Sequence, residues 1–395
     1  MRHAAALLLS ALSLASCTPR PPSVAKAPTL TLRQVRFADL PGWALDHAAQ
    51  AMPPFLASCR AWAAASPGRV LGGATGAAAL GGHAEQWRGA CDAAAGVGPG
   101  DDAARAFFET AFAPYALRDG ATDDDQGLFT GYYEPEVAGS LTRDAVAETP
   151  LLARPADLVQ VDLGAFSPDF KGRKIAGRVA DGRLVPYPDR AAIVAGGLGD
   201  AARPVAFLRD PIDAFVLQIQ GSGRVRLRGG RVVRVTYDGE NGQPYVPIGR
   251  LLLEQGEIPR ERVSMQSIRA WLEAHPDRAA GLMDQNPSYV FFRRAAELRP
   301  QDGPPGAMGA LLTPGRSIAV DPRFLPLGAP VFLATTDPLD GAPFQRLMLA
   351  QDTGGAIRGP VRADVFWGWD ADAATRAGLM RAHGTAYVLL PRTAP

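Results

Sequence analysis

The sequence predicts a mainly β protein with helices, of the α+β class. Three observations predict it: helical periodicity between about residues 40 and 120, strand-like alternation from Leu128 onward, and short apolar runs separated by glycine and proline after Asn286. A chain of 395 residues is long enough for two domains. Its 41 basic and 40 acidic residues balance, so no overall charge indicates nucleic acid as a partner.

The N-terminus, "MRHAAALLLSALSLASC", has the features of an export signal. Its apolar run from Ala4 to Leu14 is too short to span a bilayer, and small residues precede Cys17. The last four residues resemble the bacterial lipobox, after which the cysteine is lipidated; the alternative is ordinary cleavage with Cys17 incidental. We predict a lipoprotein signal peptide over residues 1–16 and a lipid on Cys17.

A Pro-rich segment follows the signal. Residues 17–31 show no hydrophobic periodicity and are predicted to form a tether. No later stretch approaches the ~20 apolar residues of a membrane span. Thr18, directly after Cys17, resembles the residue at this position in lipoproteins that are sorted to the outer membrane. The expected location is therefore the periplasmic face of the outer membrane, with the lipid as the membrane contact.

The cysteine and histidine residues point away from thiol and metal chemistry. After export, Cys59 and Cys91 are in an oxidising compartment and are predicted to form one disulfide. A cysteine nucleophile is the weaker alternative, because no Cys-His motif accompanies either residue. The five histidines are scattered singly, which disfavours a zinc site or a Ser-His-Asp triad.

Residues 32–127 are predicted to be a helical region. "DDAARAFFETAF" begins with two acids, as helix N-termini do, and continues with Phe107, Phe108 and Phe112 at helical spacing. These aromatic side chains are expected to face the protein core.

From Leu128 the period changes to that of strands. "LFTGYYEPEV" alternates, and Asp181-Gly182 and Gly229-Gly230 are predicted to be hairpin turns. In "QIQGSG" the same interpretation places Gln218 and Gln220 on one strand face, ahead of a glycine bend.

Two helices and a second β region complete the chain. Ser264 is predicted to cap one helix, and Pro276 to lie in the first turn of the next. After Asn286 the strands are short and their connections irregular, which favours a small barrel over a parallel sheet. A last helix is expected from Asp370 as N-cap to Gly384 as its stop, followed by a final strand.

The stretch "QDTGGAIRGPVRADVFWG" carries two aspartates, Asp352 and Asp364. Asp352-Thr353-Gly354 matches the triplet of aspartic proteases. Such enzymes need two carboxylates that share a proton, each from its own triplet, and this chain has one triplet. Calcium loops place acids at alternate positions, whereas these two acids end an acid-free stretch. The run Asp123–Asp125 is typical of a solvated loop.

Carboxylate acid-base chemistry is the remaining interpretation. Both aspartates adjoin apolar runs, and a carboxyl desolvated at the end of a core strand has a raised pKa and can hold a proton near neutral pH. Such an acid can protonate a glycosidic oxygen. The alternative is that both residues only cap turns around Gly354-Gly355. The residue types of Thr130, Tyr132, Tyr133, Gln218 and Gln220 suit a carbohydrate cleft, or equally a core with a strand-ending turn.

Several longer motifs follow one another along the chain: "FTGYYEP", "LQIQGSGRV", "NGQPYVPIGRLL", "SMQSIRAWL", "MDQNPSYVFF", "SIAVDPRFLPLGAPVFL" and "AQDTGGAIRGPVRADVFWG". Through these motifs the chain resembles the membrane-bound lytic murein transglycosylase A family over about residues 125 to 391, and the match is looser over 32–120.

The resemblance implies a double-psi β-barrel catalytic domain from residues 128–137 plus 286–392, a β domain inserted over 138–285, and a substrate cleft between the two. The C-terminal part also resembles the "3D" domain, named for three aspartates, which fall here on Asp321, Asp352 and Asp364. The loop between the last two is one residue longer than in some members.

By the same resemblance, Asp364 is the single catalytic acid/base and Asp352 a supporting residue. The implied reaction cleaves peptidoglycan between N-acetylmuramic acid and N-acetylglucosamine and forms 1,6-anhydromuramic ends, without cofactor or metal. A muramidase-type hydrolase and a noncatalytic cell-wall-binding barrel are the alternatives. The expected substrate contacts are Thr130, Tyr132, Tyr133, Gln220 and Asp321.

Overall fold

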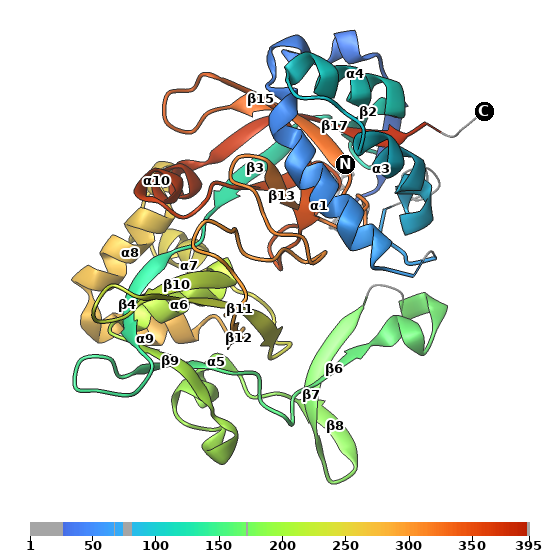
Figure 1. The fold of residues 1–395 in the computed structure, drawn as a ribbon. Coiled ribbons are helices and arrows are strands. Elements are labelled where there is room, and N and C mark those ends of the chain that lie inside the picture. Colours follow the sequence, from blue (N-terminus) through green and yellow to red (C-terminus); the bar gives the residue numbers. More distant parts are fainter. Residues whose placement is uncertain (1–26, 67, 74–80, 171–172, 393–395) are drawn as a thin grey trace, which may run out of the picture.

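The structure is a computed structural model that describes residues 27–392, apart from 67, 74–80 and 171–172. Two bodies are visible in Figure 1, an upper one with most of the N- and C-terminal segments and a lower one from the middle of the chain. The predicted signal peptide, the lipidated Cys17 and the tether up to residue 26 lie outside the described residues.

A closed six-stranded barrel forms the centre of the upper body. Its strands neighbour one another in the order β17-β14-β15-β13-β16-β3, and β3 pairs back with β17. Alternate apolar side chains such as Phe129, Phe332 and Val365 fill its core. The predicted barrel is therefore confirmed. Its strands are β3 (Gly127–Tyr132), β13 (Ser317–Val320), β14 (Pro330–Thr336), β15 (Pro343–Asp352), β16 (Arg362–Phe366) and β17 (Arg381–Pro391).

The N-terminal segment covers one side of the barrel with helices, but the expectation that residues 32–127 are helical is only partly right. Two strands extend the barrel sheet, because β2 pairs with β17 and β1 with β2. Phe107 and Phe108 are buried on a helix as predicted, whereas Phe112 begins a strand. The elements are β1 (Leu30–Gln34), α1 (Met52–Ala63), α3 (Arg88–Ala94), α4 (Asp101–Ala111) and β2 (Phe112–Asp119).

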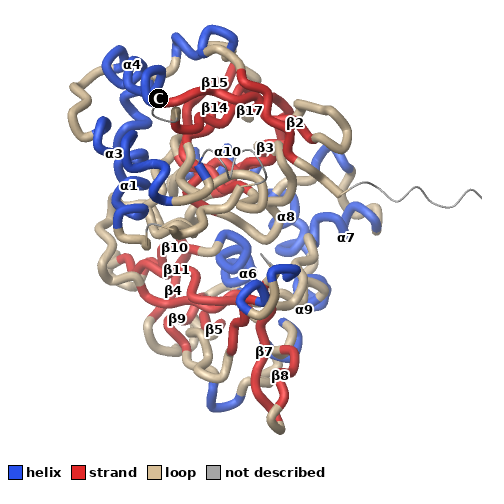
Figure 2. Tube along the Cα trace, turned by 90° about the vertical axis from the view of Figure 1, so that its right-hand side faces the viewer, coloured by secondary structure: helices blue, strands red, loops and turns tan. Residues whose placement is uncertain are grey.

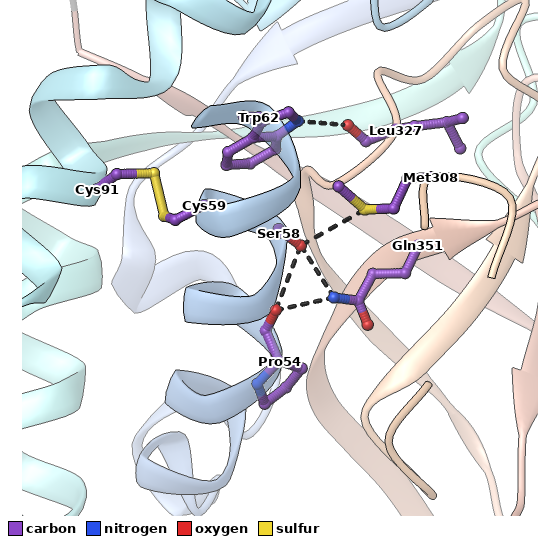
Figure 3. The surroundings of a disulfide bond; sticks show 8 residues. All are labelled: Pro54, Ser58, Cys59, Trp62, Cys91, Met308, Leu327 and Gln351. Carbon is purple, nitrogen blue, oxygen red and sulfur yellow. Dashed lines mark hydrogen bonds between the residues drawn. A yellow bond between two sulfur atoms is a disulfide. The ribbon is translucent and has the colours of Figure 1, made fainter. Parts of the chain in front are cut away.

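The predicted disulfide is present and joins α1 to α3 (Figure 3). Cys59 and Cys91 are bonded, with Cα atoms 5.6 Å apart. The same helix α1 is tied to the barrel by Gln351 on β15, whose Nε2 donates to Pro54 O at 2.8 Å and to Ser58 Oγ at 2.9 Å. Helix α1 is thus linked covalently to α3 and by hydrogen bonds to β15, the strand that ends in Asp352.

A six-stranded sheet forms the core of the lower body, in the order β12-β11-β10-β4-β9-β5. β12 pairs with β11, so it belongs to this inserted sheet and not to the barrel, where the predicted boundary at 286 had placed it. The predicted Gly229-Gly230 turn joins β10 to β11. The strands are β4 (Glu136–Ser140), β5 (Thr149–Leu152), β9 (Pro204–Leu208), β10 (Ser222–Arg226), β11 (Val232–Glu240) and β12 (Val290–Arg294).

A separate three-stranded sheet projects from the lower body, at the lower right of Figure 1 and at the bottom of Figure 2. Its strands are β6 (Val159–Asp162), β7 (Lys174–Ala180) and β8 (Arg183–Pro186), and the predicted turn at Asp181-Gly182 joins the last two. The helices of the lower body are α5 (Arg190–Val194), α6 (Pro211–Gln220), α7 (Ile248–Glu254), α8 (Met265–Ala274) and α9 (Pro276–Asp284).

The strand predicted through Gln218 and Gln220 is wrong, because both residues lie on helix α6. Asp210 caps this helix by accepting from the Ile212 amide, Pro211 occupies its first turn, and Gly221 ends it with φ 78°. These are ordinary helix start and stop signals. Most of the helix is buried, so its apolar residues do not show the one-sided pattern of a surface helix.

The helix ends were predicted with mixed success. Ser264 caps α8 and Pro276 begins α9, as expected. α10 (Ala371–Leu379) starts after Asp370 as predicted, but it ends five residues before Gly384. Gly384 lies in β17, where a Cβ atom would come within 2.3 Å of the Ala334 carbonyl oxygen, so the glycine serves close strand approach and not helix termination.

A buried charged cluster joins the two bodies. Glu134 is 1% exposed and accepts hydrogen bonds from Arg224 Nε (2.9 Å) and Arg234 Nη2 (2.7 Å) of the inserted sheet. Its amide donates to Gly368 O at 2.7 Å, and the Arg224 guanidinium lies 4.2 Å from the ring centre of Trp369, both in the upper body. The connection that leaves β3 is therefore held from both sides.

Candidate active site

Strand pairing brings the predicted acid Asp364 next to the "FTGYY" motif. β16 and β3 run parallel in adjacent positions, with Asp364 in register with Thr130 and Phe366 with Tyr132. These residues are more than 200 positions apart in the chain, so only the barrel places them together. Thr130 and Tyr132 lie two residues apart on β3 and therefore face the same side.

The carboxyl group of Asp364 is partly buried and hydrogen-bonded on one oxygen. Thr130 Oγ1 donates to Asp364 Oδ1 at 2.6 Å. Burial raises the pKa of Asp364, while the charge of Arg362 and the Thr130 hydrogen bond oppose the rise. Asp364 Oδ2 has no hydrogen bond within the described part of the chain and is not among its buried unpaired atoms, so it is open to the surroundings.

Arg362 is a member of the site that the sequence analysis missed. Its Nη2 donates to Thr130 Oγ1 at 2.8 Å, so the threonine hydroxyl has to direct its own proton toward Asp364. Burial lowers the pKa of Arg362, and the charge of Asp364 counteracts this. The available signal was its position two residues before Asp364 on the same strand face.

The second acid, Asp352, is the last residue of β15. The Tyr132 hydroxyl donates to Asp352 Oδ2 at 2.8 Å, and the Ala307 amide donates to Oδ1 at 2.9 Å. Burial raises the pKa of Asp352 to about 6 against these hydrogen bonds, and the charge of Asp364 adds to the rise. The pKa of Tyr132 lies well above its usual value, chiefly through burial, so its hydroxyl stays a donor.

Gly131 allows the two hydroxyl-bearing residues to flank the site. A Cβ atom at this position would lie 2.6 Å from Trp367 Nε1 and 2.9 Å from the Ala377 Cα atom. Any larger side chain would push β3 away from α10, and with it the donors to both acids.

Tyr133 and Gln220 contact each other, but neither residue is hydrogen-bonded to Asp352 or Asp364. The Tyr133 amide donates to Gln220 Oε1 at 3.2 Å. Tyr133 also lines a cavity of about 650 Å³ with Asp213, Arg269 and Trp369, which neither acid lines. Burial raises the pKa of Tyr133.

Asp321 does not fit its predicted role as a substrate contact. Its side chain is 0% exposed; Oδ2 accepts from Arg323 Nη2 at 2.6 Å and from the Gly359 amide at 3.0 Å. These hydrogen bonds lower the pKa of Asp321 against its burial. The carboxylate therefore holds the loop between the two candidate acids and leaves no surface for a ligand.

Across the described ranges, no cluster of three or more His, Cys, Asp and Glu residues is arranged to hold a metal ion. The acids Asp352 and Asp364 are instead hydrogen-bonded by protein hydroxyls and an amide. The arrangement is suited to holding and transferring a proton.

Comparison with known proteins agrees with this geometry. Family models described as the MltA specific insert domain and the 3D domain match residues 128–293 and 316–390. The membrane-bound lytic murein transglycosylase A of Escherichia coli K12 is 33% identical over 287 residues, 70% of this chain and 68% of the relative.

Solved structures extend the match to the whole fold. A membrane-bound lytic murein transglycosylase from Agrobacterium tumefaciens superposes with a TM-score of 0.81 at 36% identity, covering 92% of this chain and 98% of that one. E. coli MltA with bound chitohexaose gives a TM-score of 0.58 at 30% identity, covering 75% and 80%.

The fold, with its barrel and inserted domain, and these relatives define the class of protein, a lytic transglycosylase, which is a peptidoglycan lyase. The chain belongs to the membrane-bound lytic murein transglycosylase A family, with a 3D domain. The predicted family and fold are confirmed. The family models also end the insert at 293, which agrees with the position of β12 in the inserted sheet.

Proposed function

We propose that the chain cleaves the β-1,4 bond between N-acetylmuramic acid and N-acetylglucosamine of peptidoglycan, with Asp364 as its single acid/base. The observation that carries the proposal is a partly buried carboxyl with a raised pKa, one oxygen held by Thr130 and the other open. Burial of this kind favours the protonated form, and the open oxygen can present that proton to a ligand.

In the first step, protonated Asp364 donates from Oδ2 to the glycosidic oxygen, the bond to the muramoyl C1 breaks, and the N-acetylglucosamine end leaves with a new hydroxyl. The muramoyl C6 hydroxyl then attacks C1, and the carboxylate of Asp364 accepts the proton of that hydroxyl. The product is a 1,6-anhydro ring, no water is consumed, and the enzyme is regenerated. One carboxyl suffices because the substrate supplies the nucleophile, unlike the two-carboxyl schemes of hydrolases.

Asp352 is proposed to support this acid without touching the bond that breaks. Its Oδ2 accepts a hydrogen bond from the Tyr132 hydroxyl at 2.8 Å. The charge of Asp364 raises the pKa of Asp352 further, so the two carboxyl groups interact. Two neighbouring carboxyls resist being ionised together, so the pair keeps a proton more readily than either group alone.

The substrate is proposed to lie between the barrel and the inserted domain, along the side of β3 that bears Thr130 and Tyr132. The E. coli relative was crystallised with chitohexaose, a β-1,4 chain of amino sugars. Tyr133 is a further contact through the cavity that it lines. Gln220 acts on it indirectly, since its amide oxygen accepts from the Tyr133 backbone.

Membrane attachment through Cys17 at the periplasmic face of the outer membrane is also part of the proposal. The relatives are named membrane-bound. Within the described residues, none of the helices has the length and apolar character needed to cross a bilayer. A lipid on Cys17 would attach this chain to a membrane, as the name of its relatives describes for them.

The product distinguishes this reaction from its rivals. Sacculi digested with the purified protein are analysed by mass spectrometry, and anhydro ends, one water lighter than reducing ends, are expected. Reducing ends alone would identify a muramidase-type hydrolase and reject the transglycosylase proposal.

The Asp364→Asn variant tests the acid itself. The amide cannot donate an acidic proton, so release of soluble muropeptides is expected to fall by at least about 10³-fold, within the range known for general acid catalysis. Thr375→Ala, on the exposed face of α10, is the matched control. Release by Asp364→Asn at the control rate removes Asp364 from the mechanism, and absence of release by the wild type itself indicates a wall-binding protein.

A further inference from the structure

The projecting three-stranded sheet has one wholly apolar face. Val159 pairs with Gly177 and Val161 with Ile175, while Val179 pairs with Leu184. Directly paired residues share a face of an antiparallel sheet. The register thus gathers seven residues without a polar side chain, here called the arm face: Val159, Val161, Ile175, Gly177, Val179, Leu184 and Pro186.

The opposite face of the sheet carries the charges. It presents Asp162, Lys174, Arg178 and Arg183, together with Gln160. In most one-sided sheets the polar residues face water and the apolar residues face the protein.

Here the polar face is the one nearer to the inserted domain, although its charged side chains remain exposed. Burial raises the pKa of Tyr237 and of Glu240 in the inserted domain, and Gln160 and Lys174 of the polar face act against that rise. A Cβ atom on Gly242 would lie 2.8 Å from Ala176, which shares that polar face. The arm face therefore points away from the domain.

The apolar side chains are correspondingly exposed. Val179 is 64% exposed, Ile175 43% and Leu184 40%. In the connection between β6 and β7, Phe166 and Phe170 are exposed as well, Phe166 to 78%. Single exposed apolar residues are normal, but a contiguous set on one register face marks a contact surface.

Size and chemistry select among the partners. With strands about 4.8 Å apart and a rise of about 3.3 Å per residue, the arm face covers on the order of 250 Å², against roughly 800 Å² buried by each partner of a stable complex. A second copy is therefore disfavoured. A glycan is disfavoured too, because the face has no hydrogen-bonding side chain and its residues are aliphatic.

A lipid surface matches both properties, since it needs no defined area and accepts aliphatic and aromatic side chains together. Arg173, whose guanidinium lies 5.9 Å from the ring centre of the exposed Phe170, adjoins the face and can meet lipid phosphates. We propose that the arm face docks on a phospholipid membrane, as a second contact beside an N-terminal lipid. A single acyl chain holds a protein only marginally, so a weak second contact adds substantially to the residence time.

The tether permits this contact. From Cys17 to Leu30, where β1 begins, thirteen peptide steps span at most about 45 Å. A lipid on Cys17 would therefore keep the body within that distance of the anchoring membrane. The proposal does not depend on the catalytic acid, because no residue of the arm borders Asp364 or Asp352 among the contacts described.

The experiment uses the full lipidated chain in phosphatidylglycerol–phosphatidylethanolamine vesicles. Val179 is replaced by p-benzoylphenylalanine, the sample is irradiated, and adducts are identified by mass spectrometry. Arg178 replaced in the same way is the matched control, because the two residues are adjacent on β7 and face opposite sides. Phospholipid adducts are expected at 179 at roughly tenfold the yield at 178, since only the apolar side chain reaches the acyl region.

Every other outcome counts against the proposal. Equal lipid yields at both positions, a cross-linked dimer of the chain, or adducts with glycan would each assign the arm face differently. As a second test, Ile175 carries the probe in a Val179→Glu background, where lipid adducts are expected to fall about fivefold or more because a carboxylate resists insertion. Muropeptide release is measured in parallel, so that a failure of catalysis is recognised separately.

Discussion

The Thr130→Val substitution isolates one hydrogen bond to the proposed acid. Valine keeps the shape of threonine but cannot donate, so Asp364 Oδ1 loses its 2.6 Å hydrogen bond. Arg362 stays in place because its guanidinium also donates to Leu128 O (3.2 Å) and to Ala363 O. A hydrogen bond to an ionised group contributes about 1.5–3 kcal/mol and favours the charged form, so its loss raises the pKa of Asp364 by roughly 1 to 2.

The direction of the effect on activity follows from the mechanism. Asp364 has to be protonated when the reaction begins, so activity is lost as the pH rises through its pKa. The alkaline side of the pH profile of Thr130→Val is therefore expected to move upward by roughly 1 to 2 pH units. The assay is the initial rate of anhydromuropeptide release from sacculi, measured between pH 4 and 9 under conditions where the rate reports kcat/KM.

Thr130→Ser is the control, since it retains the hydroxyl and should keep the wild-type profile. An alkaline side that stays in place or moves downward in Thr130→Val would refute the assignment of Asp364 as the group that titrates. A uniform loss of rate without displacement would be the same refutation, and it would leave Thr130 a role in substrate binding alone.

The remaining predictions concern stability. The pKa of Asp352 is raised to about 6, so this group should cost the wild type up to about 3 kcal/mol of unfolding free energy between pH 4 and 7, and Asp352→Asn should lose less by that amount; denaturant titrations at both pH values test this. Glu134→Ala leaves two buried arginines unpaired and should cost about 3–5 kcal/mol by the same titration, whereas a cost below about 1 kcal/mol would contradict the proposed tie between the two bodies. Replacing Cys59 and Cys91 by serine should cost about 2–4 kcal/mol and lower the melting temperature, and an unchanged melting temperature would contradict a structural role for the disulfide.

Elements with local signals were predictable from the sequence. Ser264 and Asp370 cap their helices, and Asp181-Gly182 turns its hairpin, because each of these structures depends on a few neighbouring residues. Helix α6 was missed because its burial on several sides removes the periodicity that identifies surface helices. Strand β2 was missed because it follows a helix directly and is buried for most of its length.

The site was predictable only in part, for a related reason. That Asp352 and Asp364 adjoin buried strands could be inferred from the apolar runs around them. The role of Arg362 could not, since it depends on β16 lying parallel to a strand more than 200 residues earlier. Asp321 was misassigned because its motif carries no information on which way the carboxylate turns.

Strand β3 has a mechanical consequence. It donates to one acid through Thr130 and to the other through Tyr132, and two residues later it enters the inserted domain at Glu134. A rotation of one body against the other would therefore move the residues that hold both candidate acids. A polymer bound to both bodies would therefore act on the two acids through this one stretch of backbone.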